Sequence, residues 1–101
     1  MEGIDSTYSK VAIIGLGYVG LPTAIAFHEA GFDVTGLDID QEVISSLSGG
    51  FSHLSDSTAE LIIPVDSGRW NVCREYSKAV RGSKLVIITV PTPTHFDKSP
   101  N

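Results

Sequence analysis

Cysteine is nearly absent from this chain of 101 residues, which contains Cys73 as its single thiol. One thiol cannot form a disulfide within the chain. Disulfides accumulate in oxidising compartments, whereas thiols stay reduced in the cytosol. The cysteine content therefore predicts a cytoplasmic location.

Basic residues are also scarce, because 7 Lys and Arg stand against 12 Asp and Glu, which gives a formal net charge of −5. This balance argues against nucleic acid or an anionic membrane surface as a partner. No apolar run approaches the roughly 20 residues of a membrane span. The segment from Met1 to Ser6 lacks the basic start and apolar stretch of a signal peptide. We therefore expect no nucleic-acid partner and no membrane.

Metal ligands and nucleophiles are few as well. The three histidines, His28, His53 and His95, have no metal-ligand spacing between them. The chain has no Gly-x-Ser-x-Gly pattern. We interpret Cys73 as a packing residue of a weakly predicted strand, and His28 as a packing or solvated residue of a helix. The sequence therefore predicts no catalytic residue and no metal site.

A glycine-rich motif, Gly15-Leu-Gly-Tyr-Val-Gly20, follows the apolar run Val11–Ile14 and precedes a helix-like stretch. In a dinucleotide-binding turn, the first glycine permits the sharp bend and the second lets the backbone approach a pyrophosphate. The third lets the helix pack closely against the strand. The helix N-terminus then faces the phosphates. We therefore predict dinucleotide binding at Gly15, Gly17 and Gly20; a glycine-rich turn that binds nothing is the alternative.

Asp38 is the second element of the predicted site. It stands at the end of the expected strand Asp33–Leu37 and follows Gly20 at close to the roughly 20-residue spacing of the acid that binds the adenosine ribose. A carboxylate there accepts hydrogen bonds from ribose hydroxyls and repels a 2′-phosphate. The residue predicts NAD rather than NADP. The alternative is a helix N-cap, a role for which Asp40 is better placed.

The order of elements predicts an α/β protein. Continuous β-branched runs such as Val86-Ile-Ile88 suit strands that are buried on both faces of a parallel sheet. We predict a Rossmann-like doubly wound parallel sheet with strand order 3-2-1-4, truncated after about the fourth strand. Strands are expected at 10–14, 33–37, 70–73 and 85–90, helices at 19–30, 41–48, 57–63 and 75–80, and a loop after residue 91.

The segment Thr89-Val-Pro-Thr-Pro93 ends the fourth expected strand, beside the topological switch point where such sheets bind ligands. Its two prolines fix φ and remove two N–H donors, which stiffens the loop. The segment is therefore a candidate third element of the site. A rigid exit from the strand, without a ligand, is the alternative.

Three segments carry a family resemblance, Ile14–Pro22, Gly36–Asp40 and Val86–Pro93. They resemble the N-terminal, NAD-binding part of the UDP-glucose/GDP-mannose dehydrogenase family, and most closely the UDP-N-acetylglucosamine or UDP-N-acetylmannosamine 6-dehydrogenases. The similarity runs from about residue 10 to residue 101.

The resemblance implies NAD as the cofactor, with Thr92 in contact with it and with Tyr18 and Val19 along its pyrophosphate and adenosine side. Complete members oxidise the C6 alcohol of a nucleotide sugar to a carboxylate with two NAD, through a cysteine thiohemiacetal and thioester. A UDP-sugar substrate and a homo-oligomer are implied for the complete protein only. Members often carry a basic residue where this chain has Val43, so the loop from Asp38 to Glu42 is acidic throughout.

The length leaves room for half of a dinucleotide-binding fold and one further strand. We therefore interpret residues 1–101 as the N-terminal portion of an NAD-binding domain, a fragment without the catalytic cysteine and inactive alone. A nonenzymatic NAD(H)-sensing regulatory module is the alternative. The segment Val90–Pro93 favours the dehydrogenase, because a sensing module needs no such loop.

Overall fold

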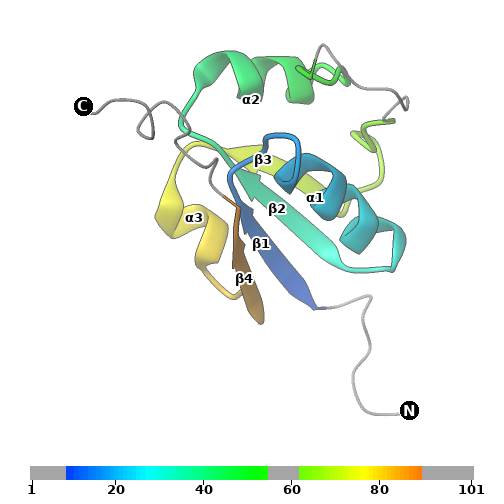
Figure 1. The fold of residues 1–101 in the computed structure, drawn as a ribbon. Coiled ribbons are helices and arrows are strands. Elements are labelled where there is room, and N and C mark those ends of the chain that lie inside the picture. The colour runs from blue at the N-terminus through cyan, green and yellow to red at the C-terminus, as the bar shows by residue number, and fades with distance from the viewer. Residues whose placement is uncertain (1–8, 55–61, 90–101) are drawn as a thin grey trace, which may run out of the picture.

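The computed structural model describes residues 9–54 and 62–89 of the chain. All neighbouring strands of its four-stranded sheet are parallel, and their order is β3-β2-β1-β4 (Figure 1). The predicted α/β, Rossmann-like fold and its strand order are confirmed. Along the chain the elements are β1 (Lys10–Ile14), α1 (Gly20–Glu29), β2 (Asp33–Leu37), α2 (Gln41–Ser48), β3 (Trp70–Cys73), α3 (Tyr76–Val80) and β4 (Leu85–Ile88).

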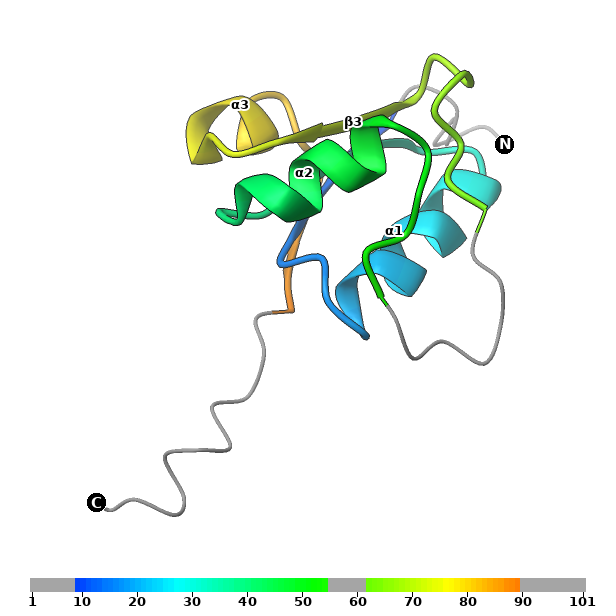
Figure 2. The same cartoon turned by 90° about the horizontal axis from the view of Figure 1, so that it is seen from above.

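Helices cover both faces of the sheet. The helices α1 and α2 lie on one face and α3 lies on the other (Figure 2). The register aligns Ile13 of β1 with Gly36 of β2 and with Ile87 of β4, so these residues project to the same face. Because both faces of β1 and β2 are covered, nearly every residue of these two strands is buried, which explains the continuous apolar run Val11–Ile14 of β1.

The core is divided by the sheet into two layers. The smaller layer, under α3, consists of Ala12, Ile14, Leu37 and Ala79, with Cys73 and Val80 packed against them. The larger layer lies between the sheet and the helices α1 and α2, and its buried members are Val11, Ile13, Leu16, Leu21, Ala24, Ile25, Val34, Ile44, Leu47, Ile63 and Trp70.

Some element ends differ from the prediction. Helix α1 spans Gly20–Glu29, with Val19 as its N-cap and Ala30 as its C-cap, so both residues lie just outside the helix. Strand β4 ends at Ile88, and Thr89 is described outside the strand. The last predicted strand residue, Val90, lies outside the described residues.

The expected helix at 57–63 is wrong for the two residues that can be judged. Residues 55–61 lie outside the described part of the chain, while Ile62 and Ile63 are described and are not helical. Proline disfavours the helical conformation of the residue before it, so Pro64 opposes a helix at Ile63. Instead, Ile63 is only 6% exposed and packs into the larger core layer.

Candidate functional site

The turn between β1 and α1 needs glycine at both of its ends. Gly15 has a φ of 96°, which lies in the left-handed region that favours glycine, and its N–H donates to the Leu37 carbonyl at 2.8 Å. A β-carbon on Gly20 would overlap the Gly15 carbonyl and the Thr89 hydroxyl. The turn therefore packs tightly against its own backbone and against the end of β4, and a larger residue than glycine does not fit at Gly15 or Gly20 without strain.

Gly17 is different, because the fold gives no reason for a glycine there. Its φ lies outside the left-handed region, and a β-carbon built on it would meet no atom of residues 9–54 and 62–89 within 4 Å. The space beside its backbone is open to a group from outside the chain. This is the role of the second glycine in a dinucleotide-binding turn, which lets the pyrophosphate approach the backbone. Gly17 therefore fits a bound dinucleotide.

The first turn of α1 is open to an anion. Within the described part of the chain no side chain caps this helix, and its first turn contains no acidic residue. Helix α2 is closed, because the Asp40 carboxylate accepts a hydrogen bond from the Glu42 N–H at 2.9 Å, as the sequence predicted for Asp40. The first N–H groups of a helix carry partial positive charge. In α1 the Leu21 N–H already donates to the Gly17 carbonyl at 3.0 Å, and Pro22 has no N–H. The Gly20 N–H is therefore the one in the first turn that has no acceptor among the described residues and is left for an anion. Helix α1 therefore presents its N-terminus at the glycine turn in a form suited to phosphate.

Asp38 lies against the glycine turn. Its Oδ2 accepts a hydrogen bond from the Leu16 N–H at 3.0 Å, and its Oδ1 accepts one from the Asp40 N–H at 3.0 Å. The Asp38 N–H in turn donates to the Cys73 carbonyl at 3.1 Å, which ties the end of β2 to the end of β3. The half-buried carboxylate is thus held at the carboxyl edge of the sheet, beside the turn.

The remaining predicted site residues are only partly placed. Tyr18 and Val19 are 60% and 66% exposed, at the open side of the turn. Thr92, like the rest of Val90–Pro93, lies outside the described residues. The structure thus brings Asp38 and the three glycines together, and the cofactor contacts assigned to these residues stay predictions.

Thr89 opens the segment that the sequence predicted as the third element of the site, but the sequence assigned it no role. Its N–H donates to the Ile14 carbonyl at 2.7 Å, and its hydroxyl donates to the Gly15 carbonyl at 2.7 Å. The segment Val86–Pro93 that carries the family resemblance includes the residue, but nothing in it indicates these contacts. A parallel pairing of the strand at 85–90 with the strand at 10–14 would have placed it beside Gly15.

Sequence reasoning also missed Arg74, which follows β3. Its Nε donates to the Ile39 carbonyl at 3.1 Å and its Nη1 donates to the Gln41 Oε1 at 3.3 Å. The loop from Asp38 to Glu42 is acidic in sequence, but this guanidinium brings a positive charge to it from a neighbouring strand. The local sequence alone therefore overstates the negative charge around the loop from Asp38 to Glu42.

His28 is a packing residue, in agreement with one of the two roles predicted for it. It is 7% exposed, its Nε2 lies 2.7 Å from the Ser67 Oγ, and its ring meets the Trp70 ring edge-on at 6.0 Å. Burial lowers the pKa of His28, and the nearby charge of Arg69 lowers it further. The Arg69 guanidinium donates to the carbonyls of His28 and Phe32 at 3.0 and 2.9 Å, which ties the end of α1 to the segment before β3.

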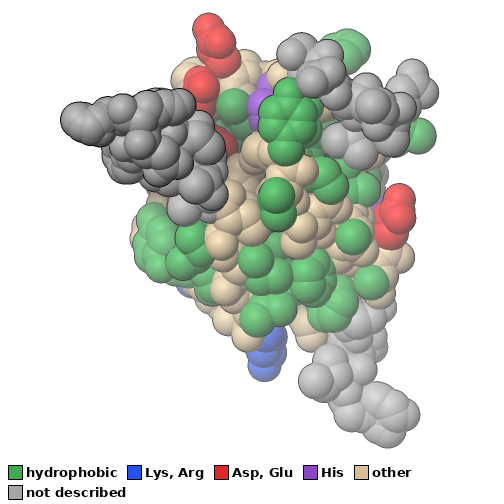
Figure 3. Space-filling view, viewed as in Figure 1, with side chains coloured by type: hydrophobic (Ala, Val, Ile, Leu, Met, Phe, Trp, Pro, Cys, Tyr) green, Lys and Arg blue, Asp and Glu red, His purple; other side chains and the backbone are tan. Residues whose placement is uncertain are grey.

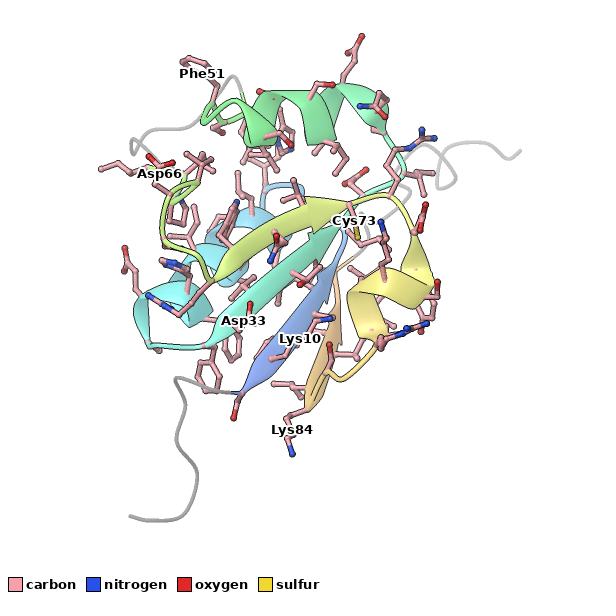
Figure 4. The ribbon with its side chains drawn as sticks, turned by 180° about the vertical axis from the view of Figure 1, so that it is seen from behind. Lys10, Asp33, Phe51, Asp66, Cys73 and Lys84 are labelled. Carbon is pink, nitrogen blue, oxygen red and sulfur yellow. The ribbon has the colours of Figure 1, made fainter. Side chains whose placement is uncertain are left out.

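Cys73 is a packing residue as predicted. It lies at the carboxyl end of β3 beside α3 (Figure 4), and it packs against the smaller core layer. Its Sγ is 3.5 Å from the Glu75 carbonyl oxygen. Within residues 9–54 and 62–89, no group of three or more His, Cys, Asp or Glu is arranged to hold a metal ion. In the same residues, no helix is long and apolar enough to cross a membrane.

Comparison with protein families matches residues 9–101 to the NAD binding domain of the UDP-glucose/GDP-mannose dehydrogenase family. Among curated proteins, a UDP-N-acetyl-D-mannosamine dehydrogenase of Pyrococcus horikoshii is 37% identical over 90 residues, which cover 87% of this chain and 21% of that protein. A UDP-N-acetyl-D-glucosamine 6-dehydrogenase of Salmonella typhi is 36% identical over 101 residues, which cover 100% of this chain and 22% of that protein.

Solved structures agree with these matches. The structure of a UDP-D-ManNAc dehydrogenase from Pyrococcus horikoshii superposes with a TM-score of 0.71 at 37% identity, covering 83% of this chain and 20% of the other. A ternary complex of a GDP-mannose dehydrogenase from Pseudomonas aeruginosa gives a TM-score of 0.74 at 30% identity, covering 82% and 20%. The chain thus spans about a fifth of the length of the relatives that it matches.

Proposed function

The chain belongs to the UDP-glucose/GDP-mannose dehydrogenase family, whose NAD binding domain it matches over residues 9–101, and on that premise we propose that its glycine turn and Asp38 form the adenosine half of an NAD site. The observation that carries the proposal is the 3.0 Å hydrogen bond from the Leu16 N–H to the Asp38 Oδ2, since it fixes an acid beside the turn. The open backbone at Gly17 and the uncapped start of α1 support it.

In this proposal each part of the site has its own role. The Gly20 N–H at the start of α1 and the backbone at Gly17 bind the pyrophosphate. Asp38 accepts hydrogen bonds from the adenosine ribose and repels a 2′-phosphate, which selects NAD over NADP. Tyr18 and Val19 line the open side of the turn, and Thr92 contributes a contact from beyond β4. When bound, NAD supplies the hydride acceptor for an oxidation.

For the complete protein we propose a 6-dehydrogenase that oxidises the C6 alcohol of a UDP-N-acetylhexosamine, or of UDP-glucose, to a carboxylate with two NAD. The names of the relatives support this substrate class. The UDP-sugar site, the homo-oligomer and a cytoplasmic location belong to the same proposal. The chain of 101 residues alone is proposed to be inactive, because oxidation to the acid needs a positioned thiolate and Cys73 is packed beside α3.

Calorimetric titration of the 101-residue chain with NAD and NADP tests the proposal. We expect weak binding of NAD and little or no binding of NADP. Asp38→Asn should weaken NAD binding by about 1–3 kcal/mol, the range of a lost charged hydrogen bond. Asp40→Asn is the matched control, because it removes the same charge from the same loop and asparagine is an equally good N-cap. Equal affinity of the wild type for NAD and NADP would contradict the assignment of Asp38.

A further inference from the structure

We propose that Thr89 is a positioning residue for the phosphate-binding turn, and that it acts together with Asp38 on a single peptide group. The inference rests on the proposed function, because the turn matters for activity only if it binds NAD. Thr89 itself has no assigned contact with the cofactor. Its role is to hold the turn in the shape that the pyrophosphate needs.

The end of β4 places Thr89 directly beside the turn. Its N–H donates to the Ile14 carbonyl at 2.7 Å, which extends the pairing of β1 and β4 by one residue beyond Ile88. The parallel register pairs Ile14 with Ile88, so Thr89 stands next to Gly15. The position of Thr89 is therefore set by the backbone of the sheet, before its side chain makes any contact.

The two polar atoms of one peptide group are held from opposite sides. The Gly15 carbonyl oxygen accepts a hydrogen bond from the Thr89 hydroxyl at 2.7 Å. The N–H of the same peptide group belongs to Leu16, and it donates to the Asp38 Oδ2 at 3.0 Å. One side chain comes from the end of β4 and the other from the end of β2, the two neighbours of β1. Together they fix the plane of the Gly15–Leu16 peptide.

The hydroxyl has a closer and a more distant acceptor. The Ile14 carbonyl oxygen is 3.3 Å from the Thr89 Oγ1, but it already accepts the Thr89 N–H. The Gly15 carbonyl oxygen is nearer, and both Gly15 and Gly20 are buried. A hydroxyl has one proton to donate. We therefore infer that the Thr89 hydroxyl donates its proton to the Gly15 carbonyl rather than to the Ile14 carbonyl.

The orientation of this peptide decides how the turn continues. Gly15 has a positive φ and, as glycine, little steric resistance to rotation, so its own backbone does not lock the peptide. The Gly15 carbonyl and the Thr89 hydroxyl both lie against the Cα of Gly20, where α1 begins. A rotated peptide would displace Gly17 and the start of α1 together. The hydroxyl thus couples the end of β4 to the open Gly20 N–H that would bind phosphate.

The test compares Thr89→Val, which keeps the shape and removes the hydroxyl, with Thr89→Ser, which keeps the hydroxyl. Thr35→Val is the matched control, because Thr35 is buried in β2 and its hydroxyl makes no hydrogen bond to the described residues. Two quantities are measured on the 101-residue chain: the dissociation constant for NAD by calorimetry, and the amide chemical shifts of Leu16 and Gly17 without ligand.

We expect Thr89→Val to weaken NAD binding by about tenfold, the effect of one lost hydrogen bond, and to move the Leu16 amide resonance. Thr89→Ser should restore both, and Thr35→Val should change neither. Unchanged NAD affinity and an unchanged Leu16 amide in Thr89→Val would overturn the inference. So would a loss of affinity that Thr89→Ser does not restore.

A wild-type measurement decides the case in which Thr89→Val does not fold. A hydroxyl proton held by a buried carbonyl exchanges slowly, so Thr89 should give its own proton resonance, with a nuclear Overhauser effect to the α-protons of Gly20. Absence of that resonance would overturn the inference. If the wild type binds no NAD, the proposed function fails, whereas the Leu16 amide and the hydroxyl resonance still decide whether Thr89 holds the turn.

Discussion

Gly36 of β2 faces the side chain of Leu16 so closely that no β-carbon fits between them. A β-carbon on Gly36 would lie 2.9 Å from the Leu16 Cδ2 and 3.0 Å from its Cδ1. Leu16 is fully buried, so its side chain has little room to move away. Glycine inside a strand is destabilising, but only glycine leaves room here for the Leu16 side chain to pack directly onto β2.

We expect Gly36→Ala to lower the free energy of unfolding by about 1–3 kcal/mol, because the added methyl group overpacks the core against Leu16. Urea denaturation would measure the change. In the double variant with Leu16→Val, which shortens the opposing side chain, the loss should be smaller than the sum of the two single losses. Strictly additive losses would show that the two residues do not interact.

Gly17→Ala should separate binding from stability. A β-carbon at this position meets no atom of the described residues within 4 Å, so the free energy of unfolding should change by no more than about 0.5–1 kcal/mol. The same methyl group would occupy the space that the pyrophosphate needs, so NAD binding should weaken by about tenfold or more. Calorimetry and urea denaturation on one preparation would measure both. Undiminished NAD affinity would remove Gly17 from the site.

The stability of the fold should depend on pH through His28. Burial, and then the charge of Arg69, lower its pKa in the folded state below the usual value of 6.5, although Glu29 opposes them. Because the unfolded chain then takes up the proton more readily, protonation of His28 favours unfolding. The contribution of neutral His28 to the free energy of unfolding is therefore complete above about pH 6.5. It is lost as the pH falls through 6.5 toward the lowered pKa.

His28→Phe keeps an aromatic ring against Trp70 and removes the titration, so its free energy of unfolding should vary less between about pH 7.5 and pH 5 than that of the wild type. Urea denaturation at several pH values would measure the difference. Parallel pH profiles of the two proteins would show that His28 does not cause the effect.

Strand β4 should promote self-association of the 101-residue chain. Among the described residues it pairs only with β1, and Leu85, Val86 and Ile88 are 46%, 38% and 64% exposed. Hydrophobic side chains gather over this part of the molecule (Figure 3). An open, apolar strand edge is a template for pairing with another chain. We therefore expect association that increases with protein concentration.

Ile88→Lys should reduce that association, because a charge at a strand edge opposes pairing. Ile62→Lys is the matched control: it adds the same charge at an exposed isoleucine outside the sheet. Analytical ultracentrifugation over a range of concentrations would measure both. An equal effect of the two substitutions would mean that net charge, rather than the edge of β4, controls association.

Local sequence was sufficient for most of the elements, because their signals act over a few residues. Apolar runs indicated β1 and β4, and the glycine motif marked the bend before α1. Asp40 was recognised as the N-cap of α2, since a cap bonds to a backbone group two residues away. The helix expected at 57–63 is wrong at its end because Pro64 and the burial of Ile63 in the core outweigh the local helical pattern.

The sequence by itself also determined the candidate residues of the site, since the spacing of Gly15, Gly17, Gly20 and Asp38 is a property of the chain. Only the tertiary structure decided how these residues are held. The Thr89 hydroxyl reaches Gly15 across 74 positions, the Asp38 carboxylate reaches Leu16 across 22, and Arg74 reaches Ile39 across 35. Such contacts leave no local pattern, because they exist only once parallel pairing has brought the carboxyl ends of β3, β2, β1 and β4 side by side.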